Sequence, residues 1–290
     1  MRKEALVKYL LGAAAVLSVL ISVGIVVALV GRALSFLADV DKSTLWGDNW
    51  APRSEQFSIK ALLTSSLLVT GTAMLIAVPV GLGAAIYLSE YANPRVRRTL
   101  KPILEVLAGI PSVVLGFFCV SLISPSIVQP LFDSAGTFSV LSAGIGVGIL
   151  SIPLVASVSE DAMRAVPLAL REASYGLGAR KITTSLRVVV PAAISGLVAA
   201  LILAVSRAIG ETMVVLLAAG SANASQYSYN PLEEGLTMTA AIASQIRGSD
   251  AAVSELVVNS LYFLGLVLFG ITMILNVVAD RFVRRVRQRY

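Results

Sequence analysis

Arg207 and Glu211 are two charged residues that stand four positions apart inside a long apolar stretch of this 290-residue chain. Placing either charge in hydrocarbon costs about 3 kcal/mol or more, so such residues usually face the interior of a helix bundle or a water-filled path. The guanidinium group is a planar fork of donors that matches the oxygens of an oxyanion. We therefore predict that Arg207 attracts an anion in a translocation path, and that Glu211 limits how tightly this anion is held.

A purely structural role for the same two residues is the alternative. If the stretch is one continuous helix, residues four apart share a face and can neutralise each other, although arginine before glutamate is the weaker order. Such an ion pair would lock helices together without carrying solute. At 1.5 Å per residue from Val188, Arg207 would also lie towards the outer edge of the apolar core.

A second polar group is the basic segment LREASYGLGARKITTSLRVVVP, residues 170–191, between two long apolar stretches. Its sequence predicts a short helix over 168–173 and another over 181–186, with a tight bend at Gly176 and Gly178. Two interpretations fit this pattern: a docking surface for a soluble partner, or an amphipathic connector held to lipid by its basic side chains. The side chains that we expect to be exposed to water are Arg171, Glu172, Tyr175 and Arg180.

The elements that must position these residues are membrane helices. Hydrophobic residues make up 57% of the chain and charged residues only 14%, where a soluble protein has about a quarter. A bilayer core needs roughly 20 apolar residues per helix, whereas barrel strands would be about 10 residues long and alternate in polarity. The fold class is therefore all-α and polytopic. The uncharged runs are residues 9–31, 61–89, 106–132, 134–159, 188–206, 212–232 and 256–279.

Charge placement predicts six spans with both termini in the cytoplasm, because lysine and arginine mark cytoplasmic loops. Basic clusters at 2–8, 95–101, 164–187 and 281–289 alternate with neutral or acidic loops. The fifth and sixth uncharged runs merge, since residues 207–211 are too few to turn the chain back. The predicted spans are 9–34, 61–89, 103–125, 138–158, 188–219 and 255–279. The predicted organisation is a first helix and outer loop (1–60), a core (61–280) with a cytoplasmic segment near 167–187, and a basic cytoplasmic tail (281–290).

Several classes of function are excluded by what the sequence lacks. It has no histidine, and its single cysteine, Cys119, lies within a span, so no CxxC metal site or intrachain disulfide exists. No GxxxxGK[ST] motif is present, so the chain does not cradle nucleotide phosphates through a P-loop. We expect no enzyme, and no metal or cofactor bound to this chain. Membrane topology accounts for the net charge of +6, so nucleic acid is not implied.

The polar segment resembles the EAA signature of ABC importer permeases, in which Glu-Ala-Ala, three residues, Gly, nine residues and Ile-x-Leu-Pro follow one another. The spacing matches throughout, with conservative changes at three positions. In that family the segment forms coupling helices that sit in a groove of the ATP-binding subunit, so the resemblance assigns Glu172, Ala173, Ser174 and Gly178 to coupling. The matching residues are Glu172, Ala173, Ser174, Gly178, Val188, Val190 and Pro191.

Other stretches are similar to the phosphate-specific ABC importer permeases: residues 77–92, 107–117, 159–167 and 207–215, within a resemblance that covers about 50–280. This implies the MetI-like fold of type I importers, in a prokaryotic plasma membrane. Arg207 and Glu211 match the family's RAxGET motif, which is implicated in transport. The implied partners are membrane lipid, a second homologous permease, two ATP-binding subunits that hold ATP and magnesium, and an extracytoplasmic phosphate-binding protein.

Two other functions remain open at this point. A permease of the same class for sulfate or molybdate would use the same architecture. An ion-coupled secondary carrier would need no ATPase, and the EAA-like segment argues against it.

Overall fold

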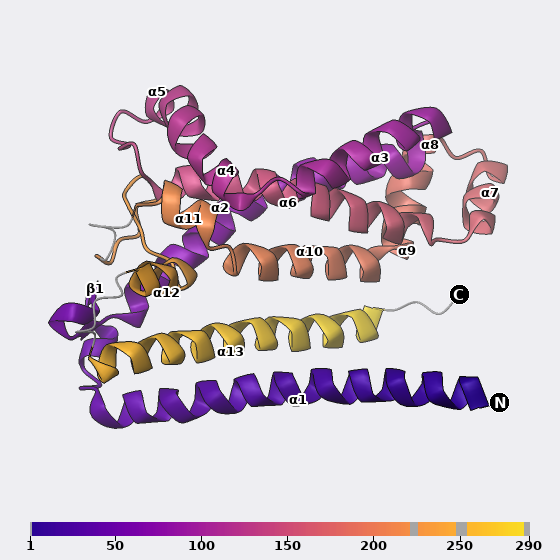
Figure 1. The fold of residues 1–290 in the computed structure, drawn as a ribbon. Coiled ribbons are helices and arrows are strands. Elements are labelled where there is room, and N and C mark those ends of the chain that lie inside the picture. The colour runs from indigo at the N-terminus through magenta and orange to yellow at the C-terminus, as the bar shows by residue number, and fades with distance from the viewer. Residues whose placement is uncertain (1, 221–225, 248–253, 287–290) are drawn as a thin grey trace.

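The computed structural model describes residues 2–220, 226–247 and 254–286 (Figure 1). Within this part of the chain almost every element is helical. The strands β1 (Trp50–Ala51) and β2 (Gln56–Phe57) form a two-residue antiparallel hairpin, which lies between the first two long helices. The single-turn helix η1 (Thr44–Trp46) precedes the hairpin, and a second one, η2 (Pro52–Ser54), connects its two strands.

Helices of very different lengths follow one another along the chain. The first half forms α1 (Arg2–Asp39), α2 (Ile59–Ile86) with a π-helical end η3 (Tyr87–Tyr91), α3 (Pro94–Ala108), α4 (Ser112–Phe118), η4 (Cys119–Val128), α5 (Gln129–Leu131) and α6 (Val140–Arg164). The second half forms α7 (Leu168–Gly176), α8 (Lys181–Thr184), η5 (Ser185–Val189), α9 (Val190–Ala192), α10 (Ile194–Ile209), α11 (Met213–Ala218), α12 (Met238–Arg247) and α13 (Glu255–Val286).

Five helices in the described part of the chain are long and apolar enough to cross a membrane: Val7–Asp39, Ile59–Tyr91, Ser112–Leu131, Val140–Arg164 and Glu255–Arg285. The helix pair Lys181–Ala192 and Ile194–Ile209 is apolar enough as well, but it is bent by 72°. The predicted total of six is reached when this bent pair counts as one broken span.

The predicted boundaries of the third span, 103–125, are wrong. The chain breaks after α3, and the span begins at Ser112. The cause is local, because Pro111 has no N–H and disfavours helical geometry at the residue before it. Gly109 ends α3, and Pro111 stands at the N-cap of α4. α3 is therefore a separate basic and apolar helix rather than the start of the span.

The fifth span, predicted over 188–219, is also not one helix. α10 ends at Ile209, and α11 begins at Met213 as a distinct element. Glu211 lies between them, and its carboxylate accepts a hydrogen bond from the backbone N–H of Val214 at 3.4 Å. The N–H of Val214 belongs to the first turn of α11, where backbone donors have no acceptor within the helix, so Glu211 satisfies it.

The core is centred on the packing of α2 against α6. A Cβ added to Gly144 would lie 2.6 Å from Cβ of Thr72, and one added to Gly148 would lie 3.0 Å from the carbonyl oxygen of Ala73. The four-residue spacing of these glycines lets the two backbones approach closely, as in other membrane helix pairs. α2 and α6 therefore form one stiff unit.

The first and last long helices lie side by side. α1 packs along α13, so α1 begins and α13 ends at the end of the molecule where α7 and α8 also lie, whereas β1 and α12 lie at the opposite end (Figure 1). At that opposite end, the N–H of Tyr227 donates to the carbonyl of Asp48 at 2.7 Å, which joins the segment before α12 to the segment after α1.

Candidate coupling and translocation sites

The segment with the EAA-like spacing folds as the predicted helix, bend and helix. After α7 the chain reverses at Gly178, whose φ of +77° lies in the left-handed region that glycine adopts without steric cost. The N–H of Gly178 donates to the carbonyl of Tyr175 at 2.9 Å. The hydroxyls of Ser174 and Thr184 lie 2.8 Å apart and tie α7 to α8. Ser174 therefore shapes the bend.

The tip of this segment is open to solvent. Glu172, Ala173 and Gly178 are exposed, and the side chain of Leu177 is 90% exposed. Leu177 was not predicted from the sequence, where its signal was an apolar residue placed between Gly176 and Gly178.

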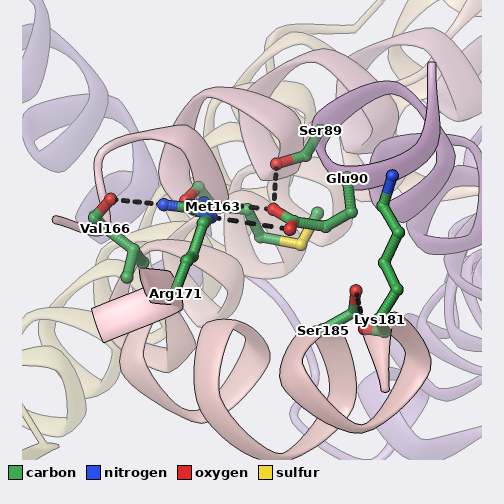
Figure 2. A network of polar contacts seen from close by, with 7 residues as sticks. All are labelled: Ser89, Glu90, Met163, Val166, Arg171, Lys181 and Ser185. Carbon is green, nitrogen blue, oxygen red and sulfur yellow. Dashed lines mark hydrogen bonds and ion pairs between the residues drawn. The ribbon is translucent and has the colours of Figure 1, made fainter. Parts of the chain in front are cut away.

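Arg171 does not point into solvent, so that prediction is wrong. Its side chain is only 13% exposed and folds back against the membrane helices, where it pairs with Glu90, which is 4% exposed. Nη2 of Arg171 lies 3.0 Å from Oε1 of Glu90 and donates to the carbonyl of Met163 at 2.9 Å, while Nη1 donates to the carbonyl of Val166 at 2.6 Å (Figure 2). The sequence pattern around Arg171 carries no trace of a partner 81 positions away.

This arginine joins three elements at one point. Glu90 belongs to η3 at the end of α2, Met163 and Val166 lie at and just beyond the end of α6, and Arg171 belongs to α7 (Figure 2). Ser89 Oγ donates to the same carboxylate at 2.9 Å. The arrangement can transmit a displacement of α7 to the stiff α2–α6 unit.

Arg207 and Glu211 do not share a helix face, so the structure does not form the ion pair that was the structural alternative for these two residues. Arg207 is exposed in the last turn of α10, Glu211 lies beyond its end, and no ion pair within 4.0 Å joins these two described residues. The carbonyl of Glu211 accepts a hydrogen bond from Oγ1 of Thr239 at 2.8 Å, which ties the connection between α10 and α11 to α12. Arg207 therefore presents its charge on the open surface of this chain.

No group of three or more metal-ligating side chains occurs among the residues whose placement is described. The chemistry available at both sites is that of charge and hydrogen bonding. An exposed arginine attracts an anion, and an exposed, tethered helix hairpin engages a protein surface.

Solved structures of other proteins share the fold of this chain. A chain from "Inward facing conformations of the MetNI methionine ABC transporter" superposes with a TM-score of 0.60 at 16% identity, covering 82% of this chain and 100% of that chain. A chain from a crystal structure of an amino acid ABC transporter gives a TM-score of 0.51 at 18% identity, covering 78% and 92%. The predicted MetI-like permease fold is confirmed.

The chain belongs to the family of binding-protein-dependent transport system inner membrane components, whose model matches residues 77–290. It is a multi-pass protein of the plasma membrane, and permease subunits of this family are not themselves enzymes. ABC importer permeases work with an ATPase and a substrate-binding protein.

Relatives from distant organisms match over most of their length. The phosphate transport system permease protein PstC of Mesorhizobium japonicum is 32% identical over 96% of this chain and 89% of its own length. The probable ABC transporter permease protein YqgH of Bacillus subtilis is 35% identical over 76% and 70%. The probable phosphate transport system permease protein PstC of Methanocaldococcus jannaschii is 31% identical over 86% and 82%.

Proposed function

We propose that this chain is the membrane subunit of an ATP-driven phosphate importer. The observation that carries the proposal is the exposed α7–α8 hairpin, tethered through Arg171 to both central membrane helices. A separate ATP-binding subunit can dock on such a hairpin and move it, whereas a gradient-driven carrier requires no docking element of this kind. Phosphate as the substrate is supported by the relatives named as phosphate permeases and by the exposed guanidinium of Arg207.

The assembled importer contains this chain, a second homologous permease, two ATP-binding subunits and an extracytoplasmic phosphate-binding protein. ATP and magnesium bind to the ATP-binding subunits. Glu172, Ala173 and Gly178 contact the ATP-binding subunit, and Ser174 holds the hairpin in shape. The α7 end faces the cytoplasm, together with both termini and the tail at 281–290. The outer region within 1–60 faces the other side, and the core at 61–280 carries the path.

Arg207 and Glu211 line the translocation path in this proposal. Arg207 lies on a surface that this chain leaves open, as expected of a path completed by a second permease. Glu211 stands four residues further along the chain, beyond the end of α10, and opposes an excess of negative charge. Phosphate is thereby attracted without being held permanently.

The experiment that tests this function is uptake of radiolabelled phosphate into proteoliposomes that hold the complete complex. We expect uptake with ATP, none with a non-hydrolysable analogue, and little inhibition by excess sulfate or molybdate. Inhibition by either of these anions as strong as by phosphate assigns a broader or different oxyanion specificity. Uptake driven by an ion gradient in the absence of the ATP-binding subunits would contradict the proposal.

Gly178→Val should weaken coupling, because the left-handed backbone costs a β-branched residue about 1–2 kcal/mol. No atom lies within 4 Å of a Cβ added at Gly178, so the backbone alone carries the penalty. Gly178→Asn is the matched control, since asparagine tolerates this conformation. We expect phosphate uptake per ATP hydrolysed to fall in the valine variant and to stay near the parent value in the asparagine variant. Equal ratios in both variants would contradict this role.

A further inference from the structure

One face of α3 borders an open hollow of about 480 Å³ near the α7 end of the molecule. Proline and charged residues recur along α3 at intervals of three or four positions, so they lie on one helix face. Arg164, in the last turn of α6, completes the wall. The side chains that matter here are Pro94, Arg97, Arg98, Lys101, Glu105 and Arg164.

Two of these cations are fixed in place by buried acid. Glu160 of α6 is fully buried and pairs with Arg97 (Nε to Oε1, 2.5 Å) and with Lys101 (Nζ to Oε2, 3.1 Å). Lys101 also pairs with Asp161 at 2.5 Å. Burial alone would lower the pKa of Lys101, but the hydrogen bonds to Asp161 and Glu160 outweigh it and the pKa is raised. Lys101 therefore stays charged at physiological pH.

The other two cations keep their charge available. Arg98 and Arg164 are exposed, and neither makes an ion pair within 4.0 Å with another described residue. The acids Glu160 and Asp161 are occupied by Arg97 and Lys101. The hollow thus presents the guanidinium groups of Arg98 and Arg164 without a paired acid in the described part of the chain, next to cations that are held by ion pairs.

Apart from Glu105, the second half of α3 is apolar, and it is uncovered. No residue of α3 is buried, and Ile103, Val106 and Leu107 are 48%, 73% and 43% exposed. This half leads through Pro111 into the third span, so it lies deeper in the membrane than the basic half. A basic half at the membrane surface followed by an apolar half in the bilayer matches the two parts of a phospholipid.

We propose that this hollow binds an anionic phospholipid, with its phosphodiester between Arg98 and Arg164 and its acyl chains along Ile103 and Val106. Basic pockets beside membrane helices on the cytoplasmic side recognise such headgroups. Glu105 in the wall disfavours a doubly charged free phosphate and tolerates the single charge of a diester. This inference rests on the membrane placement of the chain and is independent of its transported substrate.

The test titrates phosphatidylglycerol into the delipidated full chain in detergent and counts bound lipid by native mass spectrometry. In Arg98→Gln/Arg164→Gln we expect the affinity to fall by about 25-fold, since each basic residue near an anionic lipid contributes roughly fivefold. The control Arg53→Gln/Arg180→Gln loses the same charge at exposed positions elsewhere and should bind as the parent does. The lysine variants Arg98→Lys/Arg164→Lys should retain most binding, and thermal unfolding confirms that all variants fold.

Three results would overturn the proposal. Unchanged binding in the glutamine variant would remove these arginines from any lipid site. Equal affinity for phosphatidylcholine would show that headgroup charge is not recognised. Displacement of the lipid by millimolar inorganic phosphate, or by the ATP-binding subunit on assembly, would assign the hollow to a free anion or to a protein.

Discussion

Replacing Arg171 by glutamine is expected to stop most ATP-driven phosphate uptake and to lower the free energy of unfolding by about 3–5 kcal/mol. The cause is that Glu90, 4% exposed, would lose its arginine partner and keep only the hydroxyl of Ser89. The carbonyls of Met163 and Val166 would each lose a charged donor. The joint between α7 and the α2–α6 unit would then be loose as well as strained.

Thermal unfolding of the purified subunit and uptake by the assembled importer measure the two effects. Arg180→Gln removes the same charge from an exposed position on the same hairpin, and its unfolding should change by about 0.5 kcal/mol or less. The double variant Glu90→Gln/Arg171→Gln removes the unpaired charge and should recover much of the stability without recovering uptake. Parent-like unfolding and uptake in Arg171→Gln would refute the role of this joint.

Replacing Arg207 by glutamine should lower phosphate uptake by about 10- to 100-fold, because a hydrogen bond to a charged group contributes about 1.5–3 kcal/mol. Stability and assembly should stay near the parent values, since Arg207 is exposed and pairs with no described acid. Arg207→Lys retains the charge but loses the planar fork, so its uptake should be intermediate.

Replacing Glu211 should affect the release of phosphate rather than its attraction. Glu211→Gln should retain phosphate longer and release it more slowly, because the opposing charge is gone. Initial uptake rates and single-turnover release in proteoliposomes separate these effects. Undiminished uptake by a fully assembled Arg207→Gln importer would exclude Arg207 from the path.

The sequence was sufficient to predict the fold class, the approximate position of most membrane spans and the α7–α8 hairpin. Long uncharged runs and the alternation of basic loops depend only on the cost of charge in lipid, so they report topology directly. The bend at Gly178 was predictable for a similar reason, since a glycine-rich interruption between two helical patterns has few other uses.

The breaks within spans and the tertiary partners were not predictable in the same way. Hydropathy does not register the break before Pro111 or the helix end at Ile209, because both lie in apolar sequence. The local sequence pattern predicts an exposed Arg171. Its contact with Glu90 forms only when the chain folds. Long-range pairing of buried charge leaves no periodic mark on the sequence.

Helix α1 contacts the rest of the chain mainly through α13, and none of the residues in its most apolar stretch is buried within this chain. A Cβ added at Gly12, Gly24 or Gly31 would meet no atom within 4 Å. Packing within this chain therefore places little constraint on the side chains of α1. Their main constraint is the hydrophobicity that a membrane-spanning helix requires. Exchanges among leucine, valine, isoleucine and alanine there should leave the packing of this chain unchanged, whereas larger residues at Gly144 or Gly148 of α6 would collide with α2.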